Sequence, residues 1–132
     1  MAVGQSLQCL YSTGADVARW LRHNLDTANP AVWPVLTVAR AVYRQRQSMT
    51  AAIGFDESGP MSGLGLGWVT MSDEGNLPMI VQKAGGGGFM TYAALAPDRD
   101  VGIFRAVNRK DFSMGAALAA AANELIANLI IR

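Results

Sequence analysis

The residues best suited to chemistry lie in the segment 82–89, Gln-Lys-Ala-Gly-Gly-Gly-Gly-Phe, where Lys83 comes shortly before four consecutive glycines. A Walker-type phosphate loop needs the lysine after the glycines and a helix after the lysine, and neither condition holds. Gly63, Gly65 and Gly67 do not form a dinucleotide-binding loop, because a predicted strand follows them instead of a helix. By spacing alone, the segment also fits a flexible hairpin loop without chemistry, because glycine is the usual turn residue.

Hydrophobic periodicity and capping residues predict the elements that would position this segment. Thr13 is expected to cap a first helix with Asp16 bonding back to it, and Asn29 with Pro30 is expected to start a second helix. Residues 54–63 contain the clustered glycines and polar residues of a loop. Strands are then predicted over residues 64–71, 79–83, 89–96 and 101–108, with turns at 73–76 and 97–100.

A long apolar helix is predicted to follow, with Asp111 as its cap. Helices, an antiparallel meander of about four strands and a final helix predict an α+β fold, with residues 1–132 as a single domain. The last strand, 101–108, is apolar and would be an open sheet edge, and such a sheet covers only one side of the last helix. We therefore expect either a homo-oligomer or a partner chain that supplies further strands.

Composition excludes several classes of function. The chain is 51% hydrophobic and 16% charged, which excludes disorder. Its net charge of +1 gives no basic footprint for nucleic acid, and Arg40, Arg44 and Arg46 are predicted to form one solvated helix face. Cys9 and His23 are the only residues of their kinds, so an internal disulfide is impossible and zinc ligands are lacking. We expect neither a metal nor a cofactor.

Neither end of the chain predicts an export signal or a membrane span. The first residues show no basic region followed by an apolar run. The apolar stretch 112–131 is interrupted by Asn123, Glu124 and Asn128, so a buried helix is expected there. The sequence leaves the cellular location open.

Four motifs, in order along the chain, resemble those of the serine β-lactamases and penicillin-binding DD-peptidases. Residues 10–21 resemble the family's Gly-Gly-Leu-Tyr-Ser-Thr helix start, and residues 64–68 its Leu-Gly-Leu-Gly-Trp strand. Residues 83–85, Lys-Ala-Gly, resemble its Lys-Thr-Gly element. Residues 92–103 match its Tyr-x-x-x-x-Pro-x-x-x-x-Gly-Ile pair of strands. Within the family, the likeness is to class C β-lactamases and their DD-carboxypeptidase/endopeptidase relatives.

The resemblance implies a β-lactamase/transpeptidase-like fold, of which this chain would be the C-terminal part. It also implies a metal-free hydrolase of β-lactams or D-Ala-D-Ala peptides in the periplasm. Lys83 would then be the catalytic candidate, giving positive charge for a substrate carboxylate. Ala84, Gly85, Gly86 and Gly87 would bind the substrate, with the N–H of Gly86 or Gly87 as oxyanion donor. Small residues suit this strand because a substrate backbone must approach closely.

The sequence departs from the family at the nucleophile. A Ser-x-x-Lys motif is absent, because Ile80 and Val107 stand three residues before Lys83 and Lys110, the two lysines of the chain. The Tyr-x-Asn or Ser-x-Asn element is absent too, and Ala84 replaces the family's threonine. We therefore expect no acyl-enzyme from this chain alone.

Three functions stay open at this point. The chain could be a family fragment that is inactive alone, or one half of a split serine hydrolase whose partner carries Ser-x-x-Lys. It could also be an oligomeric structural module without a substrate. An independent hydrolase using Ser12, Ser62 or Cys9 would have few bases to activate it, since His23 is the sole histidine.

Overall fold

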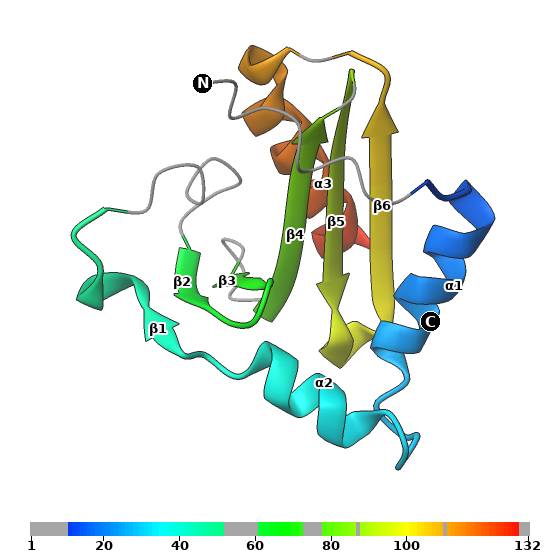
Figure 1. Ribbon diagram of the computed structural model, residues 1–132, viewed down its shortest axis with the longest axis vertical. Coiled ribbons are helices and arrows are strands. Elements are labelled where there is room, and N and C mark those ends of the chain that lie inside the picture. The colour runs from blue at the N-terminus through cyan, green and yellow to red at the C-terminus, as the bar shows by residue number, and fades with distance from the viewer. Residues whose placement is uncertain (1–10, 52–60, 73–77, 87, 110, 130–132) are drawn as a thin grey trace.

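The chain folds into one antiparallel sheet flanked by helices (Figure 1). The structure, a computed structural model, describes residues 11–51, 61–72, 78–86, 88–109 and 111–129. The helices are α1 (Gly14–Leu25), α2 (Trp33–Arg40) and α3 (Gly115–Asn128). The strands are β1 (Arg44–Gln45), β2 (Met61–Leu64), β3 (Val69–Ser72), β4 (Pro78–Gly86), β5 (Phe89–Ala96) and β6 (Val101–Val107), each hydrogen-bonded to the next. The predicted α+β class is confirmed.

Helix α1 begins as its sequence predicts. The Thr13 hydroxyl oxygen accepts a hydrogen bond from the Asp16 backbone N–H at 3.2 Å and donates one to the Asp16 carboxylate at 2.8 Å. The carboxylate also lies in the first turn, where it interacts favourably with the positive end of the helix dipole. Both effects are local, which is why the pattern alone could predict this helix start.

Helix α2 starts later than predicted. Asn29 caps a turn instead, with its Oδ1 accepting from the Ala31 N–H at 3.0 Å and its carbonyl accepting from the Trp33 N–H at 2.9 Å. The helix itself begins at Trp33 with Pro34 in its first turn, where a missing N–H costs nothing. The sequence thus offers two prolines suited to a helix start, and the helix begins beside Pro34 and not at Pro30.

The predicted strand 64–71 is wrong, because a tight turn divides it into β2 and β3. The Gly65 N–H donates to the Trp68 carbonyl at 2.7 Å, and Gly67 has a φ of 78°, a conformation that favours glycine. β1 adds a short pairing on the far side of β2. The sheet consequently has six strands where about four were predicted.

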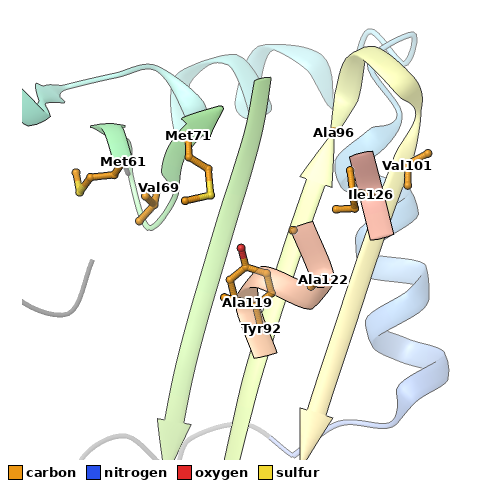
Figure 2. Close-up of a cluster of buried hydrophobic side chains, with 10 residues drawn as sticks. Met61, Val69, Met71, Tyr92, Ala96, Val101, Ala119, Ala122 and Ile126 are labelled. Atoms are coloured by element: carbon orange, nitrogen blue, oxygen red, sulfur yellow. The ribbon is translucent and has the colours of Figure 1, made fainter. Parts of the chain in front are cut away.

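The two faces of the sheet are covered by different helices, as Figure 1 shows for α1 and α3. On one face, α3 packs a stripe of residues spaced as on one side of a helix; the stripe is Ala119, Ala122 and Ile126 (Figure 2). On the other face, Leu21 of α1 packs with Trp68, Ala93 and Leu95. Because successive residues of β5 alternate between the two faces, this strand is buried on both sides.

Helix α3 begins after a 3₁₀ turn, Phe112–Met114, and has no side-chain cap. Asp111 caps this turn and not the helix, as its Oδ1 accepts from the Ser113 N–H at 3.1 Å. Leu125 remains 48% exposed, so part of the apolar circumference of α3 is uncovered. Within the described part of the chain, no helix has the length and apolar character needed to cross a bilayer.

Three arginines expected on one helix face lie on different elements: Arg40 ends α2, Arg44 is in β1 and Arg46 opens a 3₁₀ turn, Arg46–Ser48. Among the strands described, β6 has β5 as its sole neighbour, so the predicted sheet edge is present. Cys9, Gly87, the loop residues 54–60 and the turn 73–76 lie outside the described residues.

Candidate functional site

The lysine and the first glycines of the segment 82–89 are part of a regular strand, β4. Lys83, Ala84, Gly85 and Gly86 continue β4, with Cα partners on β5 that end in the Gly86–Phe89 pair. Gly88 then turns the chain with a φ of 88°, a conformation that favours glycine. The flexible-loop alternative is therefore wrong for residues 83–86, because these residues are fixed by a strand ladder.

One edge of this strand segment has no strand beside it in the described part of the sheet. The ladder between β3 and β4 ends at the Val69–Val81 pair, because β3 begins at Val69. Among the described strands, β5 is the one paired with residues 82–86. An extended peptide or an acyl group can align along such an edge and bond to its backbone, as in strand addition.

A buried polar link supports the strand opposite Lys83. Tyr92 is the Cα partner of Lys83 and is 2% exposed. Its hydroxyl donates to Oδ1 of Asn123 on α3 at 2.6 Å, and the Asn123 Nδ2 lies 3.7 Å from the sulfur of Met71 on β3. Trp68, in the turn before β3, is buried as well.

The sequence reasoning missed Asn123 as a supporting residue. In the sequence, Asn123 interrupts an apolar stretch, and in the structure it lies beside the helical stripe that contains Ala119, Ala122 and Ile126. A polar side chain at the edge of a buried stripe needs a hydrogen-bond partner. The helical spacing of Asn123 relative to this stripe could therefore have predicted that it supports a neighbouring element.

The alternative nucleophiles are poorly placed for catalysis. Ser62 donates to the Thr70 carbonyl at 3.1 Å, and Ser12 lies exposed before α1. Within the described residues neither hydroxyl is bonded to a base, and His23 is exposed on α1. No group of three or more potential metal ligands occurs among the residues described.

A separate cavity of about 580 Å³ lies at the other end of β5, between α2 and the turn after the strand. Its lining includes Trp33, Thr37, Arg40 and Asp98. Burial lowers the pKa of the Arg40 guanidinium. Pro97 in its lining is five positions along the chain from Tyr92, the partner of Lys83, and eight from Phe89, the partner of Gly86. The cavity therefore lies roughly 15 Å from Lys83 and roughly 25 Å from Gly86 along the strand, and is separate from the β4 edge.

Comparison with known proteins adds to this geometry. The family model described as Beta-lactamase matches residues 5–128. The D-alanyl-D-alanine-carboxypeptidase/endopeptidase AmpH of Escherichia coli strain K12 is 34% identical over 121 residues, which cover 91% of this chain and 31% of that protein. The crystal structure of a beta-lactamase/D-alanine carboxypeptidase from Yersinia pestis, complexed with citrate, superposes with a TM-score of 0.76 at 32% identity, covering 88% of this chain and 33% of that one. The chain thus spans about a third of the length of these relatives.

Proposed function

Because this chain belongs to the beta-lactamase family, we propose that it provides the substrate-facing strand of a serine β-lactamase or DD-peptidase site. In this proposal, residues 1–132 form one domain that corresponds to the C-terminal part of the family's fold. The observation that carries the proposal is the open edge of β4 at Lys83–Gly86, since this edge coincides with the Lys-Thr-Gly-like element.

Each residue of the strand has a proposed role. Lys83 supplies positive charge for the carboxylate of a β-lactam or of a D-Ala-D-Ala peptide. Ala84, Gly85 and Gly86 align the substrate backbone, and the N–H of Gly86 or Gly87 donates to the oxyanion. Ala84 lacks the hydroxyl of the family's threonine, so carboxylate recognition would depend more heavily on Lys83.

We propose further that the 132-residue chain is inactive alone. The sequence contains no Ser-x-x-Lys, so no serine has the neighbouring lysine that would take its proton. Intact mass spectrometry after incubation with a penicillin tests this directly, with a serine DD-peptidase that has a complete Ser-x-x-Lys motif as the positive control. We expect the control alone to gain the acyl mass. A stable adduct on this chain would refute the proposal, and peptide mapping would then identify the nucleophile.

A second candidate is one half of a split hydrolase, favoured by the sheet edge at β6 and by the partial coverage of the relatives. The partner would carry Ser-x-x-Lys and pair a strand with β6. Co-expression with the remaining two-thirds of a relative's chain, followed by assay of penicillin acylation, tests this candidate. We expect Lys83→Ala to abolish the reconstituted reaction and Lys110→Ala, which removes the other lysine, to preserve it. An equal loss of penicillin acylation in the two variants would contradict the proposed role of Lys83.

A third candidate is a structural module in which β6 pairs with the β6 of a second copy. This candidate also depends on the unpaired edge of β6. A homo-oligomer of the isolated chain would favour it, whereas a monomer would favour the split hydrolase.

A further inference from the structure

The cavity beside α2 brings together side chains from segments that are far apart in the sequence. Trp33, Thr37 and Arg40 lie three or four residues apart and so share one face of α2. Pro97 and Asp98 come from the turn that follows β5, which lies close to α2 (Figure 1). With a volume of about 580 Å³, the cavity is within the size range of ordinary small-molecule sites.

Arg40 is the cationic group of this cavity, and no carboxylate of the described residues forms an ion pair with it. Its Nη2 donates to the backbone carbonyl of Asn24 near the end of α1, and this acceptor is neutral. Its Nε is buried and has no hydrogen-bond partner among the residues described. A buried donor on a charged group rarely lacks an acceptor in proteins, so a bound ligand or water is expected beside this guanidinium.

Asp98 gives the same cavity a group of opposite charge. Its side chain is exposed, and no ion pair joins it to Arg40. A simple anion near Arg40 would be repelled by Asp98, and a simple cation near Asp98 would be repelled by Arg40. A ligand that carries both charges can place each of them beside its opposite.

The α2 side of the cavity combines an apolar wall with a hydroxyl group. The Trp33 side chain is 45% exposed, which leaves part of its indole open to a ligand. The Thr37 hydroxyl donates to the Trp33 carbonyl at 2.8 Å, so its oxygen can still accept a hydrogen bond. Apolar lining with a few polar groups that fix orientation is typical of sites for small molecules.

From this combination we propose that the cavity binds a zwitterionic α-amino acid with an aromatic or large aliphatic side chain. The ligand carboxylate lies beside the Arg40 guanidinium, and the ligand ammonium group faces Asp98. The ligand side chain packs on the Trp33 indole. This site is separate from the β4 edge, and binding to it involves no acyl transfer.

Titration of the 132-residue chain with phenylalanine tests the proposal. Binding is followed through the NMR resonance of the Trp33 indole N–H, which is assigned by its loss in Trp33→Phe. We expect a saturable shift with a Kd on the order of 1 mM, as for a ligand of this size. Phenylalaninamide lacks the carboxylate and should bind about tenfold more weakly or worse. N-acetylphenylalanine lacks the ammonium charge and should bind about threefold more weakly or worse, because Asp98 is exposed.

Matched variants test the two charged side chains. Asp98→Asn should weaken phenylalanine binding by about threefold or more, whereas Asp100→Asn, the same charge change outside the cavity lining, should not. Arg40→Gln keeps a donor for the Asn24 carbonyl but removes the charge, and it should weaken binding by about tenfold or more. Arg44→Gln is its control and should bind as the parent does. If Arg40→Gln does not fold, phenylalaninamide tests the same contact on the parent chain.

Three outcomes would overturn the proposal: no shift of the Trp33 resonance, equal binding of the three compounds, or equal weakening by the control variants. Tighter binding of N-acetylphenylalanine than of phenylalanine would also overturn it and would assign the cavity to simple carboxylates. None of these outcomes depends on penicillin acylation, so this test and that of the proposed function can fail separately.

Discussion

Tyr92 combines burial, a polar link and a position beside the proposed site. It is opposite Lys83 in the β4–β5 ladder, and its hydroxyl is held by Asn123 of α3. Removing a buried donor leaves its acceptor without that bond, and the cost exceeds the value of an exposed hydrogen bond. Removing the Tyr92 hydroxyl oxygen should therefore lower the stability of the fold at β5, the strand opposite Lys83.

We expect Tyr92→Phe to lower the free energy of unfolding by about 1 to 2 kcal/mol, measured by urea denaturation. Tyr43→Phe is the matched control, because it removes the same hydroxyl from a residue that is 53% exposed, and it should change stability by less than about 0.5 kcal/mol. Equal effects of the two variants would mean that the Tyr92–Asn123 bond contributes no more than a surface contact.

Asp111 offers a prediction about pH. The Ser113 hydroxyl and then the Ser113 backbone N–H hold the pKa of this carboxyl below its ordinary value near 3.8, and Arg109 at 3.4 Å lowers it further. Because the folded-state pKa is depressed, the stabilisation is present above the unfolded-state pKa and is lost as pH falls through the folded-state pKa. Ser113→Ala should raise the pKa of Asp111, as followed by NMR titration of the carboxyl, whereas Ser48→Ala should not. An unchanged pKa in Ser113→Ala would contradict the assigned cause.

At the scale of elements, the packing of α1 on the sheet depends on Gly102 of β6. A Cβ placed there would lie 2.8 Å from Cδ2 of Leu95 and 3.3 Å from Cδ1 of Leu25. Leu95 is 0% exposed, so its side chain can move away from an added Cβ only against its close-packed neighbours. The close approach of α1 to the strands therefore requires a residue without a side chain at this position.

We predict that Gly102→Ala destabilises the fold by about 1 to 3 kcal/mol, the usual cost of overpacking, in urea denaturation. Gly14→Ala in α1 serves as the control, because a Cβ there meets nothing within 4 Å, and it should be neutral or stabilising by up to about 1 kcal/mol. A Gly102→Ala variant as stable as the parent would show that α1 can shift away from the sheet at no cost.

At the scale of the whole molecule, the sheet ends at β6, a seven-residue strand with one described neighbour. The other end of the sheet is the two-residue strand β1, which offers far less backbone for pairing. Long apolar edges recruit further strands, whereas a charged side chain on an edge discourages this unless it is engaged elsewhere. The one charged residue of β6, Arg105, donates to the Leu118 carbonyl of α3 at 3.4 Å. The isolated chain should therefore associate through β6 when no partner is present.

Size-exclusion chromatography with light scattering should show a mass above that of a monomer for the parent chain. Ala106→Lys, at an exposed position of β6, should shift the population to monomer, whereas Gln45→Lys on β1 should leave it unchanged. A stable monomer for the parent chain would rule out the homo-oligomer and leave the split hydrolase and the fragment that is inactive alone. An oligomer untouched by Ala106→Lys would place the interface elsewhere.

Several features were determined by the sequence itself, because the interactions that create them are local. Thr13 and Asp16 are three residues apart and cap α1 whatever surrounds them. The β5 strand was predicted with its observed bounds, since the run 89–96 lies between a glycine turn and Pro97. The four ordered motifs likewise predicted the family that the comparisons confirm. The absence of Ser-x-x-Lys is also a property of the sequence alone.

Tertiary structure decided what depends on pairing between distant segments. The turn at Gly65–Trp68 divides a stretch that looked like one strand, since β2 and β3 gain a ladder by folding together. The end of the β3–β4 ladder at Val81 leaves the edge at Lys83 open, and Asn123 reaches Tyr92 across 31 positions of sequence. Sheet register and burial are set by the sum of many long-range contacts. Spacing along the sequence could therefore propose the site residues. It could not reveal which strand edge these residues occupy.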